Sequence, residues 1–540
     1  MKKVLNIIYC LVILLIVAVL IYQVDGVKES SNKNYTLVID GDNIVYKNKI
    51  FVEKGGLYLP FNTVKKVIDE DIFFDDKVKK LIVTTENEVV KFEDGKNKKQ
   101  VNLKEKECKN PFLIKEDIPY VPVTELKELY GLEIVVNEDN KMVSINNKKD
   151  SHQKVLENGV KLYSKLDTKS KVLENIKLND EIIVYGEEKL KHPRWIKVTT
   201  RKGNTGYIFR KTNLAIEDKN VAKKEEAKEN KSKEKVVMFW QQGNSLEVLG
   251  DKKDVINVAS PDWFDIISNT GDIKEKIDES YFARAKAYGY KVWPMFSNVN
   301  TEGAKELTSK LLNSEASRER LIKNILSIVD KYRLDGVNLD FENMKDEEKH
   351  LYTEFIRELA PLLRERKVTL SCDVYFVKYI ERDRVAKAVD YVMLMGYDQH
   401  WNNSPVSGSV AEISWVEKNI NYLLNDFKVK PEKLILGIPF YTRLWEENGA
   451  ARPKSTNLSL ESQEAYIKRH GLTKTWDAKA GQNYVEYQKG NKVFKMWVED
   501  EKSIKQRVEL VNKYNLAGIA AWQKRFDTDY AWQTIKDNLK

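Results

Sequence analysis

Between residue 236 and the carboxyl terminus, short apolar runs alternate with amphipathic segments long enough to form helices. That alternation is typical of βα units around a parallel sheet. The predicted strands are Val236–Trp240, Val255–Ser260, Lys291–Phe296, Gly336–Phe341, Val368–Val374, Tyr391–Met395, Leu434–Ile438 and Gly518–Trp522. Because the first and last of these eight can pair, they predict an α/β fold closed into a (β/α)8 TIM barrel rather than an open sheet. No glycine-rich phosphate loop follows the first strand, which counts against a nucleotide enzyme.

The fourth predicted strand carries a second pattern, because residues 337 to 342 alternate strictly between apolar and polar. Successive side chains of a strand point to opposite faces, so the apolar set would pack outward under helices while Asn338, Asp340 and Glu342 share the other face. Ionisable groups on a buried face are unfavourable unless they are paired or used, and a second carboxylate raises the pKa of a proton donor. The pattern indicates acid/base chemistry, and the alternative is an ordinary solvated edge strand.

The amino terminus predicts a membrane anchor over residues 1–27. Met1-Lys2-Lys3 precedes an almost uninterrupted apolar run, Val4 to Tyr22, which is long enough to cross a bilayer as a helix. Lysines before the run predict an inside amino terminus and a single-pass cell-membrane protein whose later domains are extracellular and face the cell wall. A cleaved signal peptide is the alternative, although no small-residue cleavage site follows the run.

Residues 35–148 contain an internal repeat with an offset of 62 positions. Tyr58-Leu59-Pro60-Phe61 recurs as Tyr120-Val121-Pro122-Val123, and both copies predict a strand, a short helix and a hairpin in an α+β repeat domain. The region resembles the amino-terminal domain of copper amine oxidases, a stalk-like module that brings no copper chemistry with it. Wall binding and simple spacing of the next domain are both open as its function.

Residues 152–216 read as short strands with aromatic residues, which predicts a small β-barrel. The motifs Leu162-Tyr163-Ser164, Trp195-Ile196-Lys197-Val198 and Gly206-Tyr207-Ile208 resemble a bacterial SH3-like domain. In so small a barrel the aromatic side chains are more often core than a peptide-binding surface. Residues 217–235 are almost wholly Lys, Glu, Ala and Asn, which predicts a charged linker.

The amino-acid composition argues against several classes of protein. The three cysteines exclude an extracellular disulfide framework, and Cys372, inside a predicted strand, is expected to be a packed thiol. The five histidines have no ligand spacing, so no metal and no cofactor are expected. The formal charge of +9 comes mostly from lysine spread along the chain and has no nucleic-acid signature; it suits an anionic wall or membrane, or simply a solvated surface.

Polar residues gather at the carboxyl ends of the predicted barrel strands, where such barrels have their active sites. The segment Asp335-Gly336-Val337-Asn338-Leu339-Asp340-Phe341-Glu342 resembles the DxxDxDxE signature of family 18 glycoside hydrolases. Met395-Gly396-Tyr397-Asp398 resembles the sixth-strand motif of that family, and Ala521-Trp522 its last-strand tryptophan. The resemblance covers residues 236–540 and is strongest to the bacterial spore and cell-wall glucosaminidase branch.

The resemblance implies a substrate-assisted mechanism in which the substrate's own acetamido oxygen is the nucleophile. Three residues are implied to be catalytic: Glu342 as general acid/base, Asp340 as the partner of the acetamido N–H, and Tyr397 as the donor to the acetamido carbonyl. Further substrate contacts are implied for Trp522, Met395, Asp398, Asn338, Tyr441 and Arg443. From the residues alone, Tyr397, Trp522 and Trp401 could instead be structural, and Asp335 is expected to fix the turn into its strand.

One departure from the signature is Asn338, where the family has its middle acid. The change removes a charge close to Glu342 and should reduce the coupling of protons on Asp340 without abolishing activity. The spore and cell-wall branch commonly has asparagine at this place, so the departure also supports that placement.

The leading hypothesis is hydrolysis of β-1,4 bonds in an N-acetylglucosamine-containing glycan, above all peptidoglycan, by a monomer. The expected partners are therefore a polysaccharide, the cell wall and the membrane, and no nucleic acid. The alternatives are a chitinase, an endo-N-acetylglucosaminidase on other glycans, a non-catalytic cell-wall glycan-binding protein, and a scaffold that acts through the amino-terminal modules. Retention of Glu342 with Asp340 and Tyr397 favours catalysis.

Overall fold

The computed structural model describes residues 35–147, 152–186, 188–216, 234–342 and 344–540. These residues form two compact units. The first runs to Ile72 and also contains Phe92–Lys99 and Glu105–Ala227, and the second contains Phe73–Lys91, Gln100–Lys104 and Lys228–Lys540. The predicted anchor and nearly all of the predicted linker lie outside the described residues. Within the described ranges, none of the helices is both long enough and apolar enough to span a membrane.

Each copy of the amino-terminal repeat forms a strand, a short helical turn and a hairpin. The first copy consists of β4 (Gly56–Pro60), α2 (Phe61–Val67), β5 (Phe73–Asp75) and β6 (Lys80–Thr84). The second consists of β11 (Ile118–Pro122), the 3-10 turn η1 (Val123–Leu126), β12 (Leu132–Asn137) and β13 (Met142–Asn147). The other strands of the region are β1 (Thr36–Ile39), β2 (Asp42–Ile44), β3 (Phe51–Glu53), β7 (Val89–Glu93), β8 (Lys98–Val101), β9 (Lys104–Glu107) and β10 (Leu113–Lys115).

The two repeated strands pair with each other. Strands β4 and β11 are antiparallel, with Tyr58 opposite Pro122 and Pro60 opposite Tyr120. Tyr58 is equivalent to Tyr120 in the repeat, and Pro60 is equivalent to Pro122, so the two strands are related by a local two-fold axis. The repeat seen in the sequence is therefore a structural repeat.

The SH3-like domain is a seven-stranded sheet in the order β16-β15-β19-β18-β17-β14-β20. Its strands are β14 (His152–Val155), β15 (Val160–Tyr163), β16 (Val172–Ile176), β17 (Glu181–Val184), β18 (Trp195–Thr200), β19 (Thr205–Phe209) and β20 (Leu214–Ile216). Trp195 is buried, as expected for a core aromatic, and its ring stacks on that of the exposed Phe209 at 4.4 Å between centroids.

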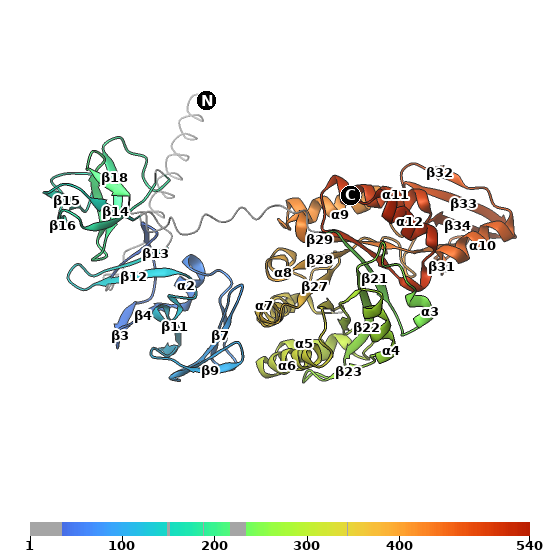
Figure 1. Ribbon diagram of the computed structural model, residues 1–540, viewed down its shortest axis with the longest axis horizontal. Coiled ribbons are helices and arrows are strands. Elements are labelled where there is room, and N and C mark those ends of the chain that lie inside the picture. The colour runs from blue at the N-terminus through green and yellow to red at the C-terminus, as the bar shows by residue number, and fades with distance from the viewer. Residues whose placement is uncertain (1–34, 148–151, 187, 217–233, 343) are drawn as a thin grey trace, which may run out of the picture. The chain divides into compact units, whose positions relative to one another are not determined.

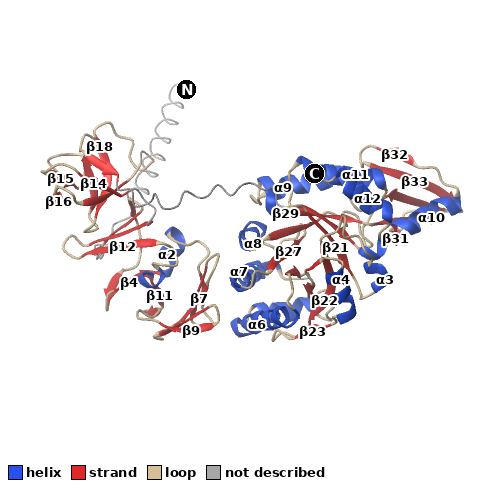
Figure 2. Cartoon of the chain, viewed as in Figure 1, coloured by secondary structure: helices blue, strands red, loops and turns tan. Residues whose placement is uncertain are grey.

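The carboxyl-terminal region is the predicted closed barrel of eight parallel strands, with helices on its outer face (Figures 1 and 2). In chain order the barrel strands are β21 (Val236–Gln241), β22 (Val258–Ile266), β24 (Lys291–Val292) with β25 (Met295–Ser297), β26 (Gly336–Asp340), β27 (Thr369–Val374), β28 (Tyr391–Met395), β29 (Leu434–Pro439) and β35 (Gly518–Trp522). Strand β21 pairs with β35 as well as with β22, so the first and last strands close the barrel.

The helices of this region lie between successive strands or follow the last one. They are α3 (Leu246–Leu249), α4 (Glu279–Ala287), α5 (Ala304–Leu312), α6 (Glu315–Tyr332), η2 (Asp346–Glu348), α7 (Lys349–Glu365), α8 (Arg382–Ala388), α9 (Ile413–Asn425), η3 (Pro431–Lys433), α11 (Glu501–Lys513), η4 (Lys524–Phe526) and α12 (Asp529–Asn538). Side-chain caps begin several of them: Asp278 accepts from the Tyr281 N–H, and Ser314 from the Ser317 N–H. Such caps satisfy amide groups that have no partner within the helix.

Three features of the carboxyl-terminal region differ from the sequence prediction. The second strand, β22, begins at Val258 and continues to Ile266, beyond the predicted end at Ser260. The third strand is divided into β24 and β25 around Trp293-Pro294, because proline has no N–H for the ladder. A five-stranded sheet with one helix, absent from the prediction, is inserted between β29 and α11. It consists of β30 (Tyr441–Asn448), β31 (Lys454–Ser459), α10 (Leu460–His470), β32 (Thr475–Asp477), β33 (Gln482–Lys489) and β34 (Lys492–Val498), while β22 also pairs with a short β23 (Ile273–Glu275).

Packing around β26 explains where its polar residues point. Val337 and Leu339 are fully buried, and the Phe341 ring lies 5.1 Å from Tyr352 and 5.8 Å from Phe355 of α7. The apolar set thus faces the helices, as the alternation predicted, and the polar set faces inward. At the start of the strand, the Asp335 carboxylate accepts from the Val292 N–H at 2.8 Å, which fixes the turn.

Candidate active site

A cavity of about 320 Å³ opens at the carboxyl ends of the barrel strands. It is lined by Met295, Asp340, Phe341, Glu342, Asp373, Tyr375, Val377, Tyr379, Ile380, Met395, Tyr397, Asp398, Trp401 and Trp522. The barrel therefore brings together six of the residues singled out from the sequence, which come from three strands far apart along the chain: Asp340, Glu342, Met395, Tyr397, Asp398 and Trp522. Asn338, Tyr441 and Arg443 are buried and do not line the cavity; each contacts a residue that does.

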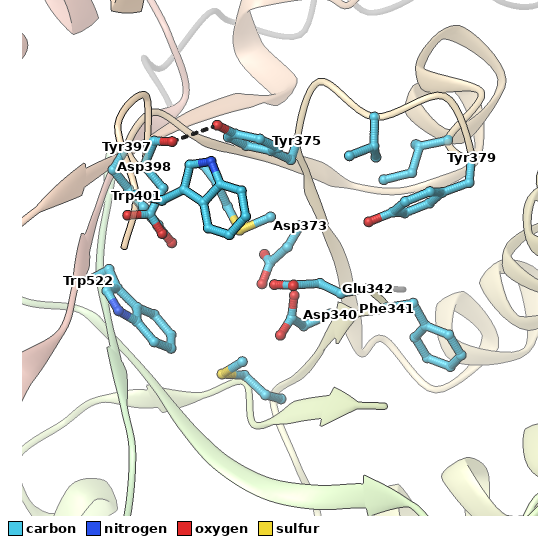
Figure 3. A pocket seen from close by; sticks show the side chains of 14 residues that line it. Asp340, Phe341, Glu342, Asp373, Tyr375, Tyr379, Tyr397, Asp398, Trp401 and Trp522 are labelled. Carbon is cyan, nitrogen blue, oxygen red and sulfur yellow. Dashed lines mark hydrogen bonds between the residues drawn. The ribbon is translucent and has the colours of Figure 1, made fainter. Parts of the chain in front are cut away.

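The acid pair lies at the end of β26: Asp340 is the last residue of the strand, and Glu342 lies just beyond it (Figure 3). Burial raises the pKa of Glu342, and the charge of Asp398 raises it further. Burial, then the charge of Glu342 and then that of Asp262, raise the pKa of Asp340 to about 8, against a weak hydrogen bond from Ser297 Oγ at 3.4 Å. Because the two carboxyls cannot easily be charged together, the site retains a proton near neutral pH.

Aromatic rings form one wall of the cavity. The rings of Tyr397 and Trp522 are stacked, with centroids 6.4 Å apart, and Trp240 lies 6.4 Å from Tyr397 and 6.1 Å from Trp522. Burial raises the pKa of the Tyr397 hydroxyl well above its usual range, so the hydroxyl remains a hydrogen-bond donor. Trp401 also lines the cavity but is 47% exposed, so it lies at the rim and is not core.

Asp398 is held by three side chains. Its backbone is in the left-handed region (φ 58°), and its carbonyl accepts from the Tyr375 hydroxyl at 3.0 Å. Its carboxylate Oδ1 accepts from the Tyr441 hydroxyl at 2.5 Å and from Arg443 Nη2 at 3.3 Å. Tyr441 and Arg443 thus fix the carboxylate whose charge raises the pKa of Glu342.

Asn298, which sequence reasoning missed, clamps the backbone of Glu342. Its Nδ2 donates to the Glu342 carbonyl at 2.7 Å, and its Oδ1 accepts from the Glu342 N–H at 2.8 Å. The Asn298 side chain is fully buried and also donates to Thr308 Oγ1 at 2.9 Å. An asparagine directly after β25 has no distinctive sequence pattern, because its partner is 44 residues away.

Asp373 in β27 is a second residue that the sequence analysis missed. Its carboxyl lines the cavity together with those of Asp340 and Glu342, and the three point toward one another (Figure 3). A signal was available, because an acid interrupts the otherwise apolar end of the fifth predicted strand. As for metals, the residues that the structure describes contain no group of three or more His, Cys, Asp and Glu side chains arranged to hold an ion.

The fold and site define a class of protein: a barrel enzyme with a buried acid pair beside stacked aromatic rings, suited to cleaving a sugar chain. Residues 282–527 match the family described as Glycosyl hydrolases family 18, so the carboxyl-terminal barrel is a glycoside hydrolase domain of that family. Residues 38–145 match the copper amine oxidase N-terminal domain, and residues 158–212 match the bacterial SH3 domain. These matches confirm the three resemblances seen in the sequence.

The chain is similar to an uncharacterised glycosylase, YvbX, of Bacillus subtilis, with 23% identity over 53% of this chain and 85% of that protein. It is also similar to a cortical fragment-lytic enzyme of Bacillus anthracis, with 23% identity over 50% of this chain and 65% of that enzyme. The crystal structure of the spore cortex-lytic enzyme SleL of Bacillus cereus shares the fold, with a TM-score of 0.51 and 20% identity over 57% of this chain and 74% of that one.

Proposed function

We propose that this protein hydrolyses β-1,4 glycosidic bonds that follow N-acetylglucosamine residues, by a retaining, substrate-assisted mechanism. The observation that carries the proposal is the meeting of Glu342, Asp340, Tyr397 and Trp522 in one cavity. A general acid, a partner for an amide N–H, a phenolic donor and a flat apolar surface are the groups that such a reaction needs.

In the first step, the Glu342 carboxyl donates its proton to the glycosidic oxygen, and the C1–O bond breaks as the acetamido oxygen bonds to C1. Burial and the charge of Asp398 raise the pKa of Glu342, which favours the protonated form that the first step needs. In the second step, Glu342 takes a proton from water, the water oxygen bonds to C1, and the acetamido oxygen leaves with its electron pair. The enzyme returns to its starting state and the configuration at C1 is retained.

The other three side chains position the acetamido group and the sugar. Asp340 accepts a hydrogen bond from the acetamido N–H and stabilises the positive charge that develops on the ring intermediate. The Tyr397 hydroxyl donates to the acetamido carbonyl and places it below C1, so that the attack is intramolecular. Trp522 offers its ring face to the C–H face of the sugar.

Peptidoglycan is the glycan that we propose as substrate, cleaved by a membrane-anchored protein that faces the cell wall. The similarity to a cortical fragment-lytic enzyme, the bacterial SH3 domain and the apolar run Val4 to Tyr22 support this part of the proposal. Both amino-terminal modules would lie between the predicted anchor and the barrel in the chain, so they could hold the barrel at the wall.

The test compares the full-length protein, Glu342→Gln and a matched control, Glu461→Gln, on peptidoglycan sacculi and on chitin oligosaccharides. We expect new reducing ends at N-acetylglucosamine from the wild type and the control, with rates about 10²- to 10⁴-fold lower for Glu342→Gln. Mass spectrometry identifies the products, and NMR of the fresh anomer reports retention or inversion. Cleavage of chitin alone would favour a chitinase, and product from neither glycan would favour a binding protein.

A further inference from the structure

The side chain of Asn338 fixes the carboxyl of Asp373 on the neighbouring strand. Asn338 Nδ2 donates to Asp373 Oδ1 at 2.8 Å and to Ser371 Oγ at 3.0 Å. Asn338 Oδ1 accepts from the indole Nε1–H of Trp240 at 3.0 Å. Because an indole N–H can only donate, Asn338 must present its oxygen to Trp240 and its amino group to Asp373. The orientation of the amide is therefore determined by its neighbours.

Asn338 engages one oxygen of Asp373, Oδ1, and the indole N–H of Trp240 also interacts with the Asp373 carboxyl. Asp373 is 3% exposed and lines the same cavity as Asp340 and Glu342. Burial raises its pKa well above the usual range, and the charges of Asp340 and Glu342 raise it further, against hydrogen bonds from Asn338 and Trp240. Its other titratable neighbours are Tyr397, Tyr352 and Cys372, and burial raises the pKa of each of them. All three are therefore neutral near neutral pH.

We propose that Asp373, on strand β27, is a positioning residue that shares a proton with Asp340. It thereby performs the role of the signature carboxylate whose place Asn338 occupies in this chain. The proposal rests on the proposed function. With its proton on the Asp373 side, Asp340 is an anion ready for the acetamido N–H, and Glu342 keeps its own proton for the glycosidic oxygen. No proton is gained or lost in this exchange, because it moves only between Asp373 and Asp340.

The charge pattern of the site supports the proposal. Three carboxyls that face one cavity cannot all be ionised without a large repulsion, so at least one must hold a proton. Of these three carboxyls, Asp373 accepts a hydrogen bond from Asn338 through its Oδ1 atom. Glu342 must give its proton to the substrate. A shared proton between Asp373 and Asp340 satisfies both requirements.

The test uses the full-length protein with Asp373→Asn, the exchange variant N338D/D373N and a matched control, Asp390→Asn. Asn at 373 can still accept from the Asn338 amide, so the packing is kept. We expect Asp373→Asn to lower kcat about tenfold or more with a smaller change in KM, and to move the alkaline limb of the kcat profile to lower pH by about one unit. The alkaline limb reports the proton on Glu342, and without the Asp373 carboxyl to repel its charged form, Glu342 loses that proton at lower pH.

The exchange variant should recover much of kcat, because it returns the carboxyl to position 338. The hydrogen bond between the two side chains is kept, with the amide at 373 now donating to the carboxylate at 338. Asp390, which accepts from the Leu370 N–H at the opposite end of the same strands, should give wild-type kcat and pH profile as Asn. Asp373→Asn with wild-type kcat and pH profile, or an exchange variant that recovers nothing, overturns the proposal. A purely structural role would lower the melting temperature and show no recovery.

A readout without turnover separates this proposal from the proposed function. In protein carrying ¹³C in its aspartate carboxyls, the Asp340 signal is assigned by its loss in Asp340→Asn. We expect that signal to titrate at lower pH in Asp373→Asn than in the wild type. Identical titration overturns the proposal even if glycan is cleaved, and a shift supports it even if the wild type cleaves no glycan tested.

Discussion

Asn298 holds Glu342 through both of its backbone hydrogen-bonding groups, at 2.7 Å to the carbonyl and 2.8 Å from the N–H. The segment after β26 is not part of the sheet, so the ladder does not position the acid there. A buried amide from the neighbouring strand performs that task instead. The position of Glu342, the proposed general acid, thus depends on the segment after β25 as well as on β26.

We expect Asn298→Ala to lower kcat about tenfold to a hundredfold with little change in KM, because small displacements of a catalytic group can cost that much. Steady-state kinetics on chitin oligosaccharides would measure both constants. Asn298→Asp, which keeps the acceptor and loses the donor, should lie between Ala and the wild type. A thermal melt identifies any loss of folding, and a wild-type kcat for Asn298→Ala would contradict the clamp.

Asp398 should set the alkaline limb of the pH profile. Burial and the charge of Asp398 raise the pKa of Glu342, whose protonated form is the proposed acid, so activity should be lost as pH rises through that pKa. Asp398→Asn removes the charge, lowers the pKa of Glu342 and should move the alkaline limb of kcat/KM to lower pH by about one unit. The exposed Asp537→Asn serves as control. A limb that stays in place would show that another group sets the pKa of Glu342.

The two cavity tryptophans should differ in their contribution to glycan binding. Trp522 stacks with Tyr397 in the same cavity as the acid pair, whereas Trp401 is 47% exposed at the rim. We expect Trp522→Ala to raise KM by about two- to tenfold, since aromatic stacking contributes about 0.5–1.5 kcal/mol beyond area burial. Trp522→Phe should keep most of this binding, and Trp401→Ala should have the smaller effect. The reverse order of the two alanine variants would contradict the proposed packing of the sugar on the Trp522 ring.

A buried ion pair fastens the insertion to the barrel. Arg507 of α11 donates to both oxygens of Glu499 at 2.9 Å and to the Ala411 carbonyl at 2.6 Å, and both side chains are almost fully buried. Arg507→Ala leaves a buried carboxylate without its partner, which should cost about 3–5 kcal/mol in free energy of unfolding. Urea denaturation would measure the loss. Lys513→Ala, which breaks an exposed pair with Glu417, should leave the midpoint unchanged.

Local patterning accounts for the parts of the site that were predicted. The alternation at 337–342 places Asp340 inward and Phe341 under α7, because successive side chains of a strand point to opposite faces. The order of the strands places Tyr397 and Trp522 at the same end of the barrel, since parallel strands share a direction. These features follow from short stretches of chain.

The inserted sheet and the two new site residues illustrate what local patterning does not contain. The long interval between Ile438 and Gly518 leaves room for an insertion, but its sequence pattern does not specify a separate sheet. The sequence around Asn298 and Asp373 does not show what either residue contacts. Only the contacts of Asn298 with Glu342 and of Asp373 with Asn338 show that they belong to the site. The partners lie 44 and 35 residues away in the chain.

The sequence by itself determined the barrel, its order of strands, the modules before it and the acid pair, because each rests on a repeating pattern or on a motif of neighbouring residues. Only the tertiary structure decided that Asn338 contacts a third carboxyl, that Asn298 clamps the backbone of Glu342, and that Tyr441 and Arg443 contact Asp398 from outside the cavity. Such relationships depend on which strands lie side by side and how far each side chain reaches, and closure of the barrel sets both.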